Sequence, residues 1–109
     1  MSEIIFWLLA AHFIADYPLQ SPEMGKYKNK KNQPTPPKGA KPVPVWVAYL
    51  SAHLFVHAGL SALVVGFPLG LLIGVIHGVQ DYFKCKLQYS PNLDQIIHIV
   101  ILVAIGSIA

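Results

Sequence analysis

Eight ionisable side chains recur in pairs within the apolar parts of the chain, and they account for every His and every Asp of its 109 residues. Each pair is spaced i, i+4, which places two side chains on one face of a helix, one turn apart. The pairs are His12 and Asp16, His53 and His57, His77 and Asp81, and Asp94 and His98. An ionisable residue in hydrocarbon costs several kcal/mol unless it faces the protein interior and finds a partner, so these residues are functional candidates.

The mixture of imidazole and carboxylate suits transition metals such as Zn, Fe, Mn or Ni and argues against Ca or Mg, which prefer oxygen ligands. Four-helix bundles build dinuclear sites from ligands that project inward from each helix. We therefore expect the eight residues to hold two divalent transition-metal ions, Zn, Mn or Fe, with Asp94 bridging them and Gln95 orienting a nucleophile. Nearby polar residues are expected to orient the ligands: Tyr17, Gln20, Gln80, Tyr82 and Gln95. A proton or ion relay and purely structural interhelical hydrogen bonds are the alternatives.

These residues require helices to position them, and four apolar runs supply candidates. The expected helices cover about residues 4–19, 43–67, 68–87 and 92–109, against the roughly 17–25 residues that span a bilayer. A break at Gly66, Phe67 and Pro68 suits a helical hairpin. The first run has neither a basic segment before it nor a small-residue cleavage site after it, so it is expected to be a retained helix.

The composition argues against a water-soluble monomer. The chain is 54% hydrophobic and 12% charged, with a mean hydropathy of +0.51, whereas soluble domains carry about 25% charged residues. The predicted fold class is therefore all-α, a single integral membrane four-helix bundle over residues 1–109. The lone Cys85 cannot form an intramolecular disulfide and is expected to be a reduced thiol.

The basic residues predict the orientation in the membrane. The chain has eight Lys and no Arg; six Lys lie in the Lys/Pro-rich loop 20–42 and two at the end of the third helix. In a four-helix topology both places lie on one side, so the loop is expected to be cytoplasmic and both termini outside. The net charge of +3 is confined to these short segments, so no nucleic-acid partner is expected.

The composition of the loop 20–42 favours extended or disordered chain. Such a loop is expected to act as a topology-setting tether or to contact anionic lipid headgroups.

Two internal patterns bear on helix packing. His12, Asp16 and Tyr17 recur as His77, Asp81 and Tyr82, which predicts two helical hairpins related as a parallel repeat. A stripe of small residues lets a neighbouring helix approach closely: Gly66, Gly70, Gly74 and Gly78. Tight packing within the chain is the expected use of this glycine stripe, and an oligomer seam is the alternative.

The strings AHFIADYPLQ, HLFVH, HGVQDYFK and LDQIIH occur in this order. As a set they resemble a domain-of-unknown-function family of small polytopic membrane proteins of bacteria and phages. More distantly the chain is similar to inner-membrane proteins described as metal-dependent hydrolases. The resemblance implies a bacterial inner-membrane location and implies that the eight His and Asp residues are the functional positions.

The expected function is a membrane-embedded, dinuclear metal-dependent hydrolase that acts at the cytoplasmic face on a lipid-linked phosphoester, ester or amide. No Ser/His/Asp elbow, Gly-rich phosphate loop or Cys/His pair offers another hydrolytic chemistry. A metal or proton transporter is one alternative, although the outer halves of the helices are almost wholly apolar. A diiron-type redox enzyme and a structural or holin-like phage membrane protein are the others.

Overall fold

The computed structural model describes residues 2–41, 44–87 and 90–109, which contain five α-helices and no strand. The helices are α1 (Ser2–Asp16), α2 (Pro22–Tyr27), α3 (Trp46–Val65), α4 (Phe67–Leu87) and α5 (Pro91–Ile108). The predicted all-α class is confirmed. The side chain of Cys85 lies outside the described part, so its reduced state stays a prediction.

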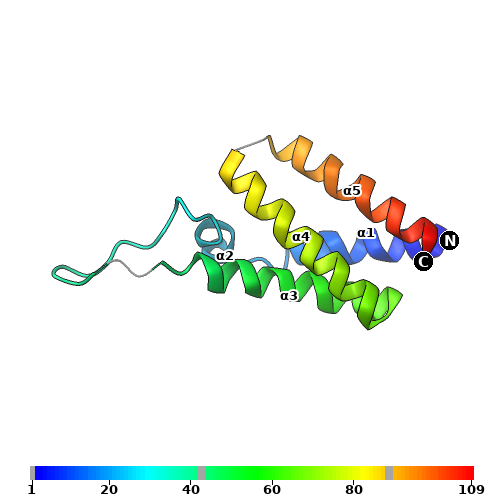
Figure 1. Cartoon of the computed structure of the whole chain (residues 1–109), viewed down its shortest axis with the longest axis horizontal. Helices are drawn as coiled ribbons and strands as arrows, with labels where there is room; N and C mark the ends of the chain where they lie inside the picture. Colours follow the sequence, from blue (N-terminus) through cyan, green and yellow to red (C-terminus); the bar gives the residue numbers. More distant parts are fainter. Residues whose placement is uncertain (1, 42–43, 88–89) are drawn as a thin grey trace.

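The four long helices pack in a ring. Helix α1 packs against α3 and α5, and α4 packs against the same two helices. This order places α1 opposite α4, and α3 opposite α5. Both termini lie at one end of the ring, and the chain that links α2 to α3 extends from the other end (Figure 1).

The turn between α3 and α4 forms where the sequence predicted a break. Gly66 has a φ of +90°, a left-handed conformation that favours glycine. Its N–H donates to the carbonyl of Ala62 at 2.9 Å and so closes the end of α3. The next helix begins at once, at Phe67.

The glycine stripe of α4 faces α3. A Cβ at Gly74 would lie 2.5 Å from the Cβ of Ala58, and one at Gly78 would lie 2.5 Å from Cδ1 of Leu54. Gly70 meets the backbone of α3 in the same way, at Ala62. The stripe thus permits close packing within the chain, while an oligomer built on it stays a prediction.

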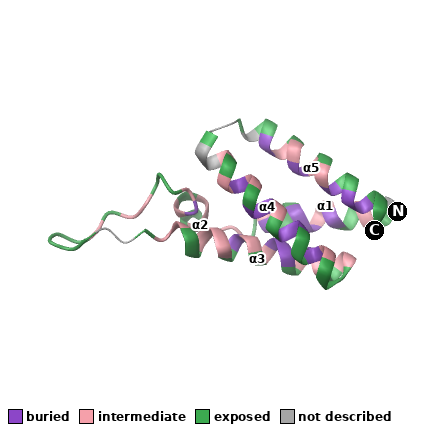
Figure 2. Ribbon diagram, in the orientation of Figure 1, coloured by how far each residue is buried: buried purple, intermediate pink, exposed green. Residues whose placement is uncertain are grey.

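The buried residues face the interior of the ring and the exposed ones lie on its outer surface (Figure 2). The paired His and Asp residues are among the buried ones, and many large apolar side chains are exposed. Leu63 is 85% exposed and Phe55 66% exposed, whereas His53 and His57, on the same helix, are at most 2% exposed. The apolar core is a small cluster toward the end that carries the termini: Leu8, Ile73, Leu102 and Ile105. Among the described residues, α3 is the one helix that is long and apolar enough to cross a membrane, and Asn92–Ile108 is a shorter apolar segment.

The expectation of extended or disordered chain in the loop 20–42 is wrong for Pro22–Tyr27, which form the short helix α2. Ser21 caps α2 by accepting a hydrogen bond from the Met24 N–H at 3.1 Å, and Pro22 occupies the first turn, where its missing N–H costs nothing. Gln33 then anchors the loop to α3, because its Oε1 accepts from the N–H groups of Val45 at 2.6 Å and Trp46 at 2.9 Å. The Ser-Pro-Glu string is a helix-start pattern, whereas the Pro and Lys content of the loop favours extended chain.

Candidate metal centre

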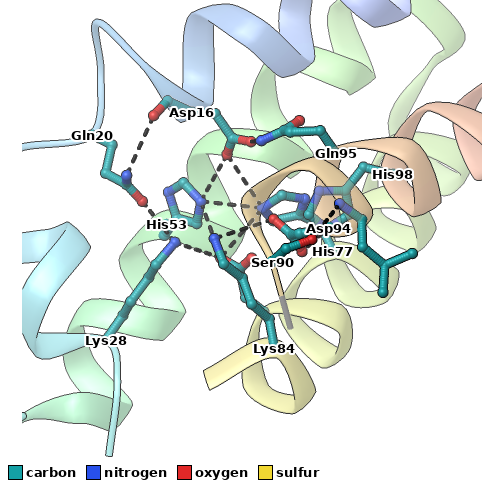
Figure 3. Close-up of polar contacts among 12 residues, drawn as sticks. Asp16, Gln20, Lys28, His53, His77, Lys84, Ser90, Asp94, Gln95 and His98 are labelled. Atoms are coloured by element: carbon teal, nitrogen blue, oxygen red, sulfur yellow. Dashed lines mark hydrogen bonds and ion pairs between the residues drawn. The ribbon is translucent and has the colours of Figure 1, made fainter. Parts of the chain in front are cut away.

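The four i, i+4 pairs converge in the interior of the ring, one pair from each long helix. Seven of the eight residues are at most 3% exposed, and the Asp16 side chain is 11% exposed. Helical periodicity explains the convergence, because each pair occupies one stripe of its helix and all four stripes face inward. Figure 3 shows Asp16, His53 and His77 pointing toward one another from three different helices.

Asp16 lies at the centre of the cluster. Its Oδ1 is 2.8 Å from Nε2 of His57, 3.1 Å from Nε2 of His53 and 3.5 Å from Nε2 of His77. Its Oδ2 is 3.2 Å from Nε2 of His12. One carboxylate therefore contacts ring nitrogens from α1, α3 and α4.

A second carboxylate, Asp81, shares two of these histidines. Its Oδ2 is 3.3 Å from Nε2 of His53 and 3.4 Å from Nε2 of His77, and those two nitrogens are 3.1 Å apart. The same oxygen is 2.8 Å from Nζ of Lys28, a residue just beyond α2 that is only 7% exposed. Asp81 thus joins the histidine cluster to the loop.

Asp94 and His98 lie at the α5 side of the cluster. Oδ1 of Asp94 is 3.7 Å from Nε2 of His98, and its Oδ2 is 3.2 Å from Nζ of Lys84. Asp94 was the expected bridging ligand, but Asp16 has the more central position. The difference arises because the rotation and depth of each helix decide which carboxylate reaches the middle.

Three overlapping groups have donor atoms close enough for a metal ion. They are His12, Asp16, His57 and His77; His53, His77 and Asp81; and Asp81, Asp94 and His98. Two ligands that bind one ion at about 2.0–2.2 Å with tetrahedral angles lie about 3.3–3.6 Å apart, and most distances in the cluster fall near this range. Among the described residues, both ring nitrogens of His98 and Nδ1 of His53 are buried without a hydrogen-bond partner. The donor set therefore fits one or two transition-metal ions.

The glutamines expected around the site have different places. Gln95 is part of it: its Oε1 is 2.9 Å from Nε2 of His12, and its Nε2 donates to Oδ2 of Asp16 at 3.2 Å. Gln20 accepts from Lys28 Nζ at 2.7 Å and donates to the Asp16 carbonyl at 3.3 Å. The buried Nε2 of Gln80 has no hydrogen-bond partner within the described chain.

The two tyrosines expected near the site lie at its margin or outside it. Tyr17 is 61% exposed and lines a cavity beside Asp16. The ring of Tyr82 lies 5.9 Å from that of Trp46. Tyr82 thus packs near the start of α3.

The cluster opens at one end and is closed at the other. At the loop end lies a cavity of about 210 Å³ whose lining side chains are all polar, among them Asp16, Asp81 and Asp94. At the terminus end, Leu8, Ile73 and Leu102 pack together with their side chains at most 5% exposed. The site is therefore reached from the loop side.

Lys28 and Lys84 are the polar residues of this site that sequence reasoning missed. In the sequence, both belong only to the charge pattern that predicts topology. The position of Lys84 three residues after Asp81 on one helix could have indicated it, since i, i+3 residues are neighbours. For Lys28 the helix-start pattern at Ser21 offered a hint of order, but no local pattern relates it to Asp81, 53 residues away.

Residues 4–109 match the family described as "Protein of unknown function (DUF3307)". The match covers nearly the whole chain. The fold and the site define an all-helical protein with a buried His/Asp cluster. The chain belongs to this family. No curated protein and no solved structure shows significant similarity to it.

Proposed function

We propose that the chain spans a bacterial inner membrane with α1, α3, α4 and α5, both termini outside and the loop 20–42 in the cytoplasm. The reversed distribution of polarity supports this proposal, because large apolar side chains on the outer faces suit lipid and ionisable residues in lipid face the bundle interior. Trp46 and Tyr49 at the start of α3 have the interfacial character of aromatic belts. The ring order, with α1 opposite α4, is compatible with the parallel repeat that the sequence predicts.

The cluster, in this proposal, holds two divalent transition-metal ions, Zn, Mn or Fe. The single observation that carries it is the contact of four imidazole Nε2 atoms with the Asp16 carboxylate at 2.8–3.5 Å. The Nε2 atoms of His53 and His77 lie 3.1 Å apart, and both lie 3.3–3.4 Å from Oδ2 of Asp81, so three candidate donor atoms for one ion converge there. A relay or a purely structural network would satisfy its hydrogen bonds more fully than this cluster does.

The function that this arrangement supports best is metal-dependent hydrolysis of a membrane-associated substrate at the cytoplasmic face. Bound divalent ions would polarise the scissile bond and lower the pKa of a bound water toward neutrality. The chain's own residues then have defined tasks. Asp16 holds the ligands of α1, α3 and α4 together, and Gln95 fixes the orientations of Asp16 and His12 through its amide.

A transporter would use the same side chains but needs access from both sides. The packed cluster of Leu8, Ile73, Leu102 and Ile105 argues against it, because an ion would cross apolar side chains with no ligand.

Elemental analysis of the detergent-purified protein tests the proposal, together with hydrolysis assays on phosphoester, carboxylic ester and amide lipids. We expect about two metal ions per chain, and hydrolysis that a chelator removes and added metal restores. His57→Ala should lose metal, whereas Ser51→Ala, a polar change on the same helix outside the cluster, should keep it. A folded wild-type protein without metal, or metal-bound protein without hydrolysis of any lipid, would contradict the proposal.

A further inference from the structure

Two ammonium groups lie at the open end of the candidate metal centre, and each is held by one of its carboxylates. Nζ of Lys28 is 2.8 Å from Oδ2 of Asp81 and donates to Oε1 of Gln20 at 2.7 Å. Nζ of Lys84 is 3.2 Å from Oδ2 of Asp94. In Figure 3 the two lysines reach the same cluster from different parts of the chain, the segment after α2 and the helix α4.

Both lysines line the polar cavity of about 210 Å³. Asp16, Asp81 and Asp94 line it as well, so a group inside the cavity would touch the ammonium groups and the candidate ligands together. The Lys84 side chain is 31% exposed and can change rotamer at little cost, whereas Lys28 is nearly buried. The cavity is therefore a pocket with two positive groups directly beside the reaction centre.

The charge balance decides what such a pocket attracts. Without metal, three carboxylates outnumber two ammonium groups, and each ammonium has a carboxylate partner. With two divalent ions bound to the carboxylates and the histidines neutral, the two ions and two lysines would carry six positive charges against three negative ones. The site would then have a net charge of three positive. A buried excess of this size demands an anion. A carboxylic ester or an amide brings no charge, but a phosphate group brings one or two, together with oxygens that accept hydrogen bonds from Lys.

Resting on the proposed function, we propose that this cavity is a phosphate-binding site and that the substrate is a phosphoester. Lys28 and Lys84 exchange their carboxylate partners for phosphate oxygens when metal occupies the centre. Phosphate binding is thus coupled to metal binding, because the metal-free carboxylates compete for the same ammonium groups. Gln20, already bonded to Lys28, holds that lysine at the cavity during the exchange.

Isothermal titration of inorganic phosphate into the detergent-purified protein tests the inference, with the metal content of each sample measured in parallel. We expect binding to the metal-loaded protein and at least about tenfold weaker binding after chelation. Lys84→Gln should weaken phosphate binding about tenfold, the loss of one charge-assisted hydrogen bond, without loss of metal. Lys38→Gln removes the same charge from an exposed part of the loop and should change nothing.

A second arm distinguishes the sources of phosphate. Binding of inorganic phosphate is measured with the protein in phosphatidylcholine vesicles that either contain or lack phosphatidic acid. Competition by phosphatidic acid against inorganic phosphate would assign the site to lipid headgroups. Competition by glycerol phosphate alone would assign it to soluble phosphoesters. Lys28→Gln is measured beside Lys84→Gln. Because the buried Lys28 also holds the loop to the bundle, its substitution could unfold the protein. In that case the result for Lys84→Gln decides.

The outcomes separate the two proposals. Metal-loaded protein that binds no phosphate overturns this inference and leaves the metal centre standing. Phosphate binding that Lys38→Gln and Lys84→Gln weaken equally also overturns it, because the attraction would then come from the general charge of the basic segments. Protein without metal overturns both.

Discussion

Asp16→Asn is the sharpest single test of the metal centre. The substitution keeps the shape of the side chain and removes one negative charge and one acceptor oxygen. In the structure both oxygens are in use: Oδ1 faces His53, His57 and His77, and Oδ2 faces His12 and accepts from Gln95. An amide can keep an oxygen on only one of these sides, and its NH₂ facing Gln95 Nε2 would set donor against donor.

The magnitude follows from the role of the carboxylate. Removing a group that merely orients a ligand costs about 10–100-fold in metal affinity. Asp16 is itself a candidate metal ligand and also contacts several histidines, so the loss in metal affinity should exceed about 100-fold, or about 2.8 kcal/mol. In the metal-free protein the same change costs about 1.5–3 kcal/mol for each charge-assisted hydrogen bond that the amide fails to replace.

Elemental analysis and a metal titration on wild type, Asp16→Asn and Glu3→Gln measure the effect. Glu3 is an exposed carboxylate near the other end of α1, so its neutralisation controls for net charge. Both metal ions should be lost from Asp16→Asn and kept in Glu3→Gln. Full metal content in a folded Asp16→Asn protein would refute the central role of this carboxylate.

Three further predictions concern packing, topology and access. Gly74→Val should destabilise the protein by about 1–3 kcal/mol through overpacking against Ala58. Gly59→Ala, at an open position, should be almost neutral. Equal thermal midpoints of wild type and Gly74→Val would contradict the packing of α4 on α3. A cysteine placed at Thr35 in a Cys85→Ser background should resist a membrane-impermeant reagent in intact cells, and its labelling would invert the topology. Proteoliposomes should show no metal or proton flux, and flux that His77→Ala abolishes would favour a transporter.

The sequence predicted the helices and the turn because their causes are local. The i, i+4 spacing fixes which face each His and Asp shares, and the Gly66 to Pro68 string interrupts a long apolar run. With one ionisable stripe per apolar helix, burial of all four stripes is what the proposed membrane setting requires, because ionisable groups exposed to lipid are costly. These arguments need no knowledge of how the helices are placed relative to one another.

The details that depend on three-dimensional placement could not be predicted in this way. Asp16, rather than Asp94, is the central carboxylate because its oxygens lie within 3.5 Å of Nε2 atoms on α1, α3 and α4, which depends on how the helices pack. Lys28 reaches Asp81 across 53 residues because α2 and Gln33 return the loop to the bundle. Composition alone describes such a loop as a tether, since it records the charges but not the contacts they make.

The spread of the cluster along the chain has a consequence for biosynthesis. The largest group of candidate donors, His12, Asp16, His57 and His77, comes from α1, α3 and α4, and only the group that joins Asp81 to Asp94 and His98 needs α5. Each helix alone offers two donors, fewer than the four that a tetrahedral ion requires. In the proposed metal centre, a nascent chain would therefore hold metal only weakly until three helices have met. The α5 ligands, and the contact of Gln95 with His12 across 83 residues, would complete the centre last.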